Sequence, residues 1–327
     1  AGAEGARQCE KRYTSKSSRP GVPCLIPAKE YPYKKNTPWR TTLGRRILEA
    51  ATGRVKEEEC GGFELFGDST WCLGAMKGKG VLGLSYGIEE RDLWSEKMSN
   101  VFKMPTRLYD CFIPPRQSPP MRGSAPNATG PCDQNGPHCY ETPYRPFRTC
   151  LGPENRTIAG RRYETLHSHL RGRGRLSTHV KIDTEGTEWG VLENLLKSPG
   201  DQDKIRTLEM EVHFSYVPEA AAGELRALPE QQRLQREVRV LERLSERFVC
   251  VGSTIEVYNE DTNLAKDCPR HSCDEPAVHL PNLQLDQFAV SFVHRELVGL
   301  KVKSKTKSMT KPAPAPAPAE PTDAEPA

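Results

Sequence analysis

Acidic residues and one histidine follow two neighbouring apolar segments in the middle of the chain. The group that could do chemistry there consists of Asp183, Glu185, Glu188 and His213. Carboxylates and imidazoles are common general acids and bases in proteins. We therefore expect Asp183 or His213 to be able to act as a general base, with Glu185 close by.

A second candidate site lies earlier in the chain, where the apolar run Val81–Ser85 leads into a turn. The turn reads Ser85-Tyr86-Gly87-Ile88, and Asp110 ends the next strand-like run. A glycine at such a turn lets the backbone approach a ligand, and an acidic residue after the second strand can accept hydrogen bonds from a ribose diol. The turn has one glycine instead of three, so an ordinary strand-to-helix turn is the alternative.

Each of these residues also has a purely structural interpretation. Asp183 and Glu185 could cap the helix that begins near Thr187, because negative charge is favourable at a helix N-terminus. His213 could be a hydrogen-bonded histidine at the end of a strand. The segment Cys268–Cys273 encloses His271, but its spacing fits a structural zinc site poorly. We predict a local disulfide there and no metal site.

The elements that must position these residues alternate between apolar runs and helical patterns, which favours a parallel sheet flanked by helices. We expect strands at Val81–Ser85, Arg107–Phe112, Phe147–Leu151, Thr178–Asp183, Ile205–Phe214, Phe248–Val257 and Phe288–Val293. We expect helices at Asp92–Met104, Tyr163–Leu170, Glu188–Leu196 and Glu230–Phe248. The prediction is an α/β domain over residues 78–296.

The rest of the chain has a different composition. Residues 1–77 read as an irregular N-terminal stem, apart from a short helix at Thr42–Ala51. Residues 114–146 are a Pro/Gly/Asn-rich insertion, which we place on the surface. Residues 297–327 are rich in lysine and then in proline and alanine, a composition that favours a disordered tail.

One segment closely resembles a known family. Val180-Lys-Ile-Asp183-Thr-Glu185-Gly-Thr-Glu188-Trp189 is similar to the motif of FkbM-like methyltransferases, and Glu211-Val-His213 is similar to the end of their following strand. The turn at Gly87, the acidic Asp110 and the last strand fit the same resemblance, which covers about two thirds of the chain. It implies a Rossmann-like, seven-stranded class I methyltransferase fold that uses S-adenosylmethionine. Gly87 would then lie under the methionine part of the cofactor, and Asp110 would hold the ribose.

Cysteines and sequons bear on the compartment. The chain has 11 cysteines and two glycosylation sequons, at Asn127 and Asn155, which favours the secretory pathway, in the Golgi lumen or outside the cell. We predict disulfides between Cys268 and Cys273 and between Cys132 and Cys139. The chain begins at Ala1, so we expect that an N-terminal leader or anchor has been removed.

Charge and hydropathy exclude two partner classes. The 47 basic and 43 acidic residues give a net charge of +4, which provides no concentrated basic face for nucleic acid. No run of 18 or more apolar residues occurs that could span a membrane. The resemblance implies an S-adenosylmethionine-dependent O-methylation of a hydroxyl on a small molecule or glycan. The alternative is a non-catalytic module with the same fold, used for ligand binding or scaffolding.

Overall fold

The computed structural model describes most of the predicted domain and part of the N-terminal region. The described residues are 38–66, 69–122, 139–214, 228–254, 278–280, 283–285 and 287–299. Several predictions concern residues outside these ranges. They are the disulfide between Cys268 and Cys273, Cys132 as the partner of Cys139, the sequon at Asn127 and the tail after residue 299.

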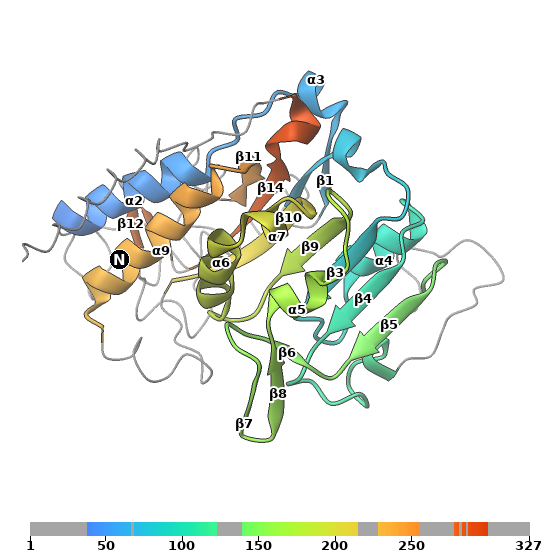
Figure 1. Ribbon diagram of the computed structural model, residues 1–327. Coiled ribbons are helices and arrows are strands. Elements are labelled where there is room, and N and C mark those ends of the chain that lie inside the picture. Colours follow the sequence, from blue (N-terminus) through green and yellow to red (C-terminus); the bar gives the residue numbers. More distant parts are fainter. Residues whose placement is uncertain are drawn as a thin grey trace, which may run out of the picture.

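A seven-stranded sheet forms the centre of the molecule (Figure 1). In chain order its strands are β3 (Leu82–Tyr86), β4 (Thr106–Tyr109), β5 (Tyr144–Phe147), β9 (Thr178–Ile182), β10 (Ile205–His213), β11 (Phe248–Ser253) and β14 (Gln287–His294). Their spatial order is β11-β14-β10-β9-β3-β4-β5. All neighbours pair in parallel except β14, which is antiparallel to both β10 and β11. The predicted α/β architecture with a seven-stranded, mostly parallel sheet is confirmed.

The strand order reverses between β3 and β9. The chain runs outward from β3 through β4 to β5, returns, and continues on the other side of β3 with β9 and β10. Parallel β3 and β9 therefore end at the same edge, and their following loops diverge to opposite sides of the sheet. Ligands of open α/β sheets bind in the crevice outside such a reversal point.

Burial explains why these segments form strands. All five residues of β3 are buried, as expected for a parallel strand that is covered on both faces. In β10 the apolar side chains of Leu208, Met210 and Val212 enter the main core. Because side chains alternate along a strand, Glu211 and His213 share the opposite face.

Helices cover the sheet. They are α2 (Pro38–Ala51), α4 (Leu93–Asn100), α5 (Leu166–Leu170), α6 (Glu188–Lys197), α7 (Pro199–Gln202) and α9 (Glu230–Leu244). In α9, Leu234, Val238 and Leu241 form a buried stripe at helical spacing. Figure 1 shows α2 lying beside α9. Among the described residues, no helix combines the length and the apolar character that crossing a membrane requires.

The prediction of an irregular stem over residues 1–77 is wrong from residue 38 onward. This region forms α2, α3 (Glu57–Cys60), the hairpin of β1 (Phe63–Phe66) and β2 (Ser69–Cys72), and a 3-10 turn at Leu73–Met76. Leu43, Ile47 and Ala51 of α2 are buried in the main core. Ion pairs of Arg40 with Glu230 and of Arg46 with Glu242 join α2 to α9. The helix predicted at Thr42–Ala51 is confirmed, and it begins earlier, at Pro38.

The predictions around the insertion also need correction. The third strand of the sheet is Tyr144–Phe147, earlier than the predicted Phe147–Leu151, and it pairs with β4. In the described parts of the predicted surface insertion, Ser118, Met121 and Tyr140 are buried, so these parts are not wholly on the surface. Cys150–Leu151 (β6) instead joins a small sheet with β7 (Arg156–Ile158) and β8 (Arg161–Glu164).

Element ends differ at two further places. The helix predicted at Tyr163–Leu170 begins at Leu166, because Tyr163 lies in β8 and the Thr165 side chain caps the helix by accepting the Ser168 amide. The domain also continues past residue 296, through a 3-10 turn at Arg295–Val298 whose Val298 is buried. A short hairpin of β12 (Val278–Leu280) and β13 (Leu283–Leu285) precedes β14.

Two disulfides lie within the described residues, Cys60–Cys72 and Cys111–Cys150. Cys139 is also disulfide-bonded, whereas Cys250 is a buried thiol whose Sγ donates to the Ala51 carbonyl. Disulfides are typical of proteins in oxidising compartments. They are consistent with the predicted export from the cytosol.

Candidate functional site

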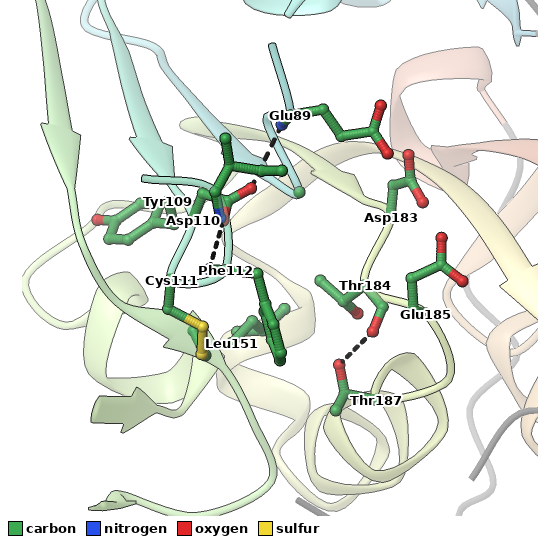
Figure 2. Close-up of a pocket in the computed structure, with 13 residues that line it drawn as sticks. Glu89, Tyr109, Asp110, Cys111, Phe112, Leu151, Asp183, Thr184, Glu185 and Thr187 are labelled. Atoms are coloured by element: carbon green, nitrogen blue, oxygen red, sulfur yellow. Dashed lines mark hydrogen bonds between the residues drawn. A yellow bond between two sulfur atoms is a disulfide. The ribbon is translucent and has the colours of Figure 1, made fainter. Parts of the chain in front are cut away.

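A pocket of about 150 Å³ opens at the carboxyl ends of β3, β4 and β9, at the point where the strand order reverses. Figure 2 shows Glu89, Asp183 and Glu185 along one side of it, and Tyr109 and Cys111 on the other. Its walls are formed by Gly87, Glu89, Tyr109–Ile113, Cys150, Leu151, Asp183–Glu185 and Thr187. Gly87, Asp110, Asp183 and Glu185, four of the predicted site residues, are thus brought together.

Gly87 is required at the bottom of this pocket. Its φ is +77°, and a Cβ added there would lie 1.7 Å from the carbonyl oxygen of Asp183. The Gly87 amide donates to the Tyr109 carbonyl, and its own carbonyl accepts from Lys181 Nζ at 2.7 Å. Two strand ends therefore approach each other closely only because residue 87 has no side chain.

Two non-glycine residues at the pocket have left-handed backbone conformations. Glu89 has a φ of +53° and Glu185 a φ of +50°. Such conformations cost about 1 kcal/mol or more each and persist where the surrounding structure imposes them, often at functional sites. Both carboxylates are carried by the two loops that diverge from β3 and β9.

Asp110 organises the loop that follows β4. Its Oδ2 accepts the amides of Ile88 and Glu89 at 3.0 and 3.3 Å, and its Oδ1 accepts those of Phe112 and Ile113 at 2.8 and 3.1 Å. A carboxylate has about four lone-pair sites, so these amides fill its acceptor capacity. Asp110 therefore ties the loop after β3 to the loop after β4, and a ribose diol would compete with the backbone for it.

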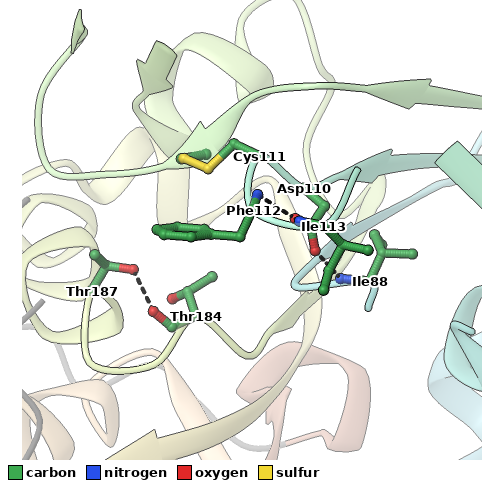
Figure 3. The surroundings of a disulfide bond; sticks show 8 residues. Ile88, Asp110, Cys111, Phe112, Ile113, Thr184 and Thr187 are labelled. Carbon is green, nitrogen blue, oxygen red and sulfur yellow. Dashed lines mark hydrogen bonds between the residues drawn. A yellow bond between two sulfur atoms is a disulfide. The ribbon is translucent and has the colours of Figure 1, made fainter. Parts of the chain in front are cut away.

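Phe112 and a disulfide form a wall that the sequence did not indicate. The Phe112 ring is 59% exposed although it lines the pocket. Figure 3 shows it between the Cys111–Cys150 disulfide and the threonines Thr184 and Thr187. An exposed aromatic ring inside a pocket is a surface on which a flat or apolar group can pack. Its position two residues after the predicted acidic residue Asp110 was the only signal for it in the sequence.

The other predicted cofactor residues do not line the pocket. Ser85 and Ile88 are buried. Tyr86 is also buried, stacks on Tyr109 with ring centroids 4.8 Å apart, and its hydroxyl lies 2.7 Å from Nδ1 of His169. Ser85, Tyr86 and Ile88 therefore support the turn through packing, and Gly87 alone faces the ligand space.

Asp183 and Glu185 do not cap the following helix. The first turn of α6 has no side-chain cap among the described residues. Asp183 instead lies 3.3 Å from Lys181 Nζ, through its Oδ2 atom. Glu185 is more than half exposed. Burial nevertheless raises its pKa, although the neighbouring His213 acts in the opposite direction.

Glu188 and His213 form a buried pair behind the pocket. The Glu188 side chain is fully buried, and its Oε1 accepts the His213 amide at 2.8 Å and lies 3.1 Å from His213 Nδ1. Its Oε2 accepts the Gly186 amide. Burial alone would lower the pKa of His213, but the hydrogen bond to Glu188 and the charges of Glu188 and Glu185 raise it to about 9.

These positions separate the roles of the predicted catalytic residues. A histidine that is already protonated at neutral pH cannot act as a general base there. Glu188, which has no exposed surface, is a positioning residue for His213 and for the loop after β9. Asp183 and Glu185 are the predicted catalytic residues that line the pocket and whose carboxylates can accept a proton.

No family name follows from similarity. Comparisons of the chain with protein-family models, with curated proteins and with solved structures each find no match, so the function is argued from the geometry of this pocket.

Proposed function

We propose that this chain is an S-adenosylmethionine-dependent methyltransferase that methylates a hydroxyl of a small molecule or a glycan. The observation that carries the proposal is the close approach of Gly87 to the Asp183 carbonyl, which only a residue without a side chain permits. This contact lies at the reversal of strand order, beside a pocket that contains a carboxylate, where open α/β sheets bind their ligands.

Strand order supports the same proposal. The first five strands follow the doubly wound order of nucleotide-binding sheets. The last strand, β14, enters antiparallel between β10 and β11, which departs from that order and fits the class I methyltransferase fold implied by the sequence resemblance. Fold alone does not assign an activity, so the pocket residues carry the chemical argument.

The cofactor would supply a methyl group that is already activated on a sulfonium, so that alignment of the acceptor provides most of the rate enhancement. The chain must hold the acceptor in line and take up its proton. Asp183 is placed for the proton: its carboxylate would accept the hydrogen of an acceptor hydroxyl held in the pocket, while the bound cofactor would supply the methyl group. Lys181, which contacts Asp183 and Gly87, fixes that carboxylate.

The alternative is a non-catalytic module with the same fold, and one observation favours it. Because four backbone amides saturate Asp110, the residue predicted to hold the ribose is engaged in the structure of the loop. A module of this kind would use the pocket around Phe112 for ligand recognition without turnover.

Location within the secretory pathway is part of the proposal. The disulfides Cys60–Cys72 and Cys111–Cys150 support an oxidising compartment. Asn155, in the sequon that lies within the described residues, is exposed at the start of the projecting β7–β8 hairpin. Both features fit a Golgi or extracellular protein acting on glycans or exported metabolites.

Calorimetric titration of the full chain with S-adenosylhomocysteine, the product form of the cofactor, tests the proposal. We expect one equivalent to bind. Phe112→Ala should weaken binding at least fivefold, because it removes a pocket wall while deleting a side chain that is largely exposed in the free protein. Leu65→Ala, which truncates an exposed residue outside the pocket lining, is the matched control and should bind as wild type.

Two results would count against it. Correctly folded wild-type protein that binds no S-adenosylhomocysteine refutes the cofactor. The non-catalytic alternative is supported if the protein binds S-adenosylhomocysteine but no methyl group is transferred to any of a panel of hydroxylated acceptors, and if Asp183→Asn changes nothing.

A further inference from the structure

Three potential metal ligands meet at the ends of β9 and β10. They are Asp183, Glu211 and His213, and one ligand atom of each lies within 4.8 Å of the other two. Glu211 and His213 alternate on the same face of β10, and Asp183 follows the neighbouring parallel strand. The sequence predicted no metal site, because the three residues are on two strands whose pairing only the fold establishes.

The spacing of these atoms is close to that of a coordination shell. Nitrogen and oxygen ligands lie about 2.1 Å from a first-row divalent ion, so two ligand atoms on opposite sides of it are at most about 4.2 Å apart. The present maximum of 4.8 Å exceeds this by a few tenths of an ångström. Small rotations of two partly exposed carboxylate side chains are sufficient to close the difference.

His213 provides an independent indication. Its side chain is only 5% exposed, and the buried Glu188 carboxylate holds Nδ1. Nε2 forms an ion pair with Glu185 Oε2 at 3.6 Å, so the second ring nitrogen lies beside an acidic side chain. A carboxylate that orients one ring nitrogen while the other faces acidic side chains is the usual outer-shell arrangement of a metal-binding histidine.

The ligand side chains also contact neighbouring polar groups. Lys181 lies 3.3 Å from Oδ2 of Asp183 and orients that carboxylate. Gln287 donates to Oε1 of Glu211 at 2.8 Å and orients that carboxylate from β14. An ion would replace the proton on Nε2 of His213, while the Nδ1 contact with Glu188 is retained.

We propose that Asp183, Glu211 and His213 bind one divalent transition-metal ion, of the Mn²⁺ or Zn²⁺ class. Two carboxylates and one imidazole suit such ions better than Ca²⁺ or Mg²⁺, which prefer oxygen ligands alone. Three protein ligands leave coordination positions for water or for a substrate oxygen. The site adjoins the pocket through Asp183, but binding of the ion does not depend on the proposed methyl transfer.

Titration of the full chain with MnCl₂, after treatment with chelator and dialysis, tests the proposal. The signal of free Mn²⁺ in electron paramagnetic resonance, together with calorimetry, reports binding. We expect one equivalent to bind and ZnCl₂ to displace it. Glu211→Gln and Asp183→Asn should each weaken Mn²⁺ binding at least tenfold, because each replaces a charged ligand with a poor one.

Glu89→Gln is the matched control. Glu89 lines the same pocket and carries the same charge, but it is not part of the three-residue group, so its substitution should change the affinity less than threefold. Thermal unfolding shows whether each variant is folded. If one of the two ligand variants does not fold, the other is sufficient for the test.

The proposal is overturned if folded wild-type protein binds neither Mn²⁺ nor Zn²⁺, or if Glu89→Gln weakens binding as much as the ligand variants do. A titration with S-adenosylhomocysteine in the presence of chelator separates this outcome from failure of the proposed function, because it requires no metal.

Discussion

The substitution Gly87→Ala tests the central feature of the candidate site, the close approach of two strand ends. Gly80 offers a matched control. It has a φ of +68°, similar to the +77° of Gly87, but a Cβ added at Gly80 would meet nothing within 4 Å. Both substitutions impose a left-handed conformation on alanine, which costs about 1–2 kcal/mol. Only Gly87→Ala adds a collision.

The size of that collision sets the expected difference. A Cβ at residue 87 would lie 1.7 Å from the Asp183 carbonyl oxygen, and ordinary contact begins at 3.4 Å. The ends of β3 and β9 would have to separate by well over an ångström. That movement breaks or strains the bonds from the Gly87 amide to Tyr109 and from Lys181 to Gly87, each worth about 1 kcal/mol. We expect Gly87→Ala to lose about 3–5 kcal/mol, and Gly80→Ala about 1–2 kcal/mol.

Urea unfolding followed by circular dichroism measures both values. If the two variants have equal unfolding free energies, the close contact at the strand reversal does not exist, and the argument that this edge is shaped for a ligand fails with it. If Gly87→Ala folds with the larger loss, its affinity for S-adenosylhomocysteine should also decrease, whereas that of Gly80→Ala should not.

Three further outcomes follow from packing, cross-linking and titration. Ile47→Ala should cost about 2–4 kcal/mol, because Ile47 is fully buried, while Leu65→Ala, at a residue that is 71% exposed, should stay within about 0.5 kcal/mol; equal losses would mean that α2 is not part of the core. Replacing Cys111 and Cys150 by serine should cost about 4 kcal/mol in urea unfolding, since the bond closes a loop over a sequence separation of 39, and an unchanged midpoint would contradict the pairing. Burial, together with the charge of Arg206, lowers the pKa of His179 to about 3. Below about pH 6.5 the unfolded chain therefore binds a proton at His179 that the native protein does not bind. Through this group the free energy of unfolding falls by about 1.4 kcal/mol per pH unit as the pH decreases toward 3. His179→Gln should reduce the slope of the unfolding free energy between pH 5.5 and 4.5 by that amount, and an unaltered slope would refute the assignment.

Much of the sheet could be predicted from local sequence. Buried parallel strands need continuous apolar runs, so β3, β9, β10 and β14 were found within about two residues of their observed ends, and the stripe of α9 identified its helix. The helix predicted at Thr42–Ala51 also matches α2 except at its start. The strand β5 was misplaced, because it is an edge strand containing Pro146, which is weak as a local signal.

The sequence by itself determined which residue types gather at the carboxyl edge, because Gly87, Asp110, Asp183 and His213 each follow an apolar run that must be a strand. The tertiary structure alone decided what they do there. Four backbone amides from two loops converge on Asp110, buried Glu188 turns His213 into a cation, and Glu211 comes beside Asp183. These are contacts between segments far apart in the chain, and their distances depend on strand order and register, which no local pattern encodes.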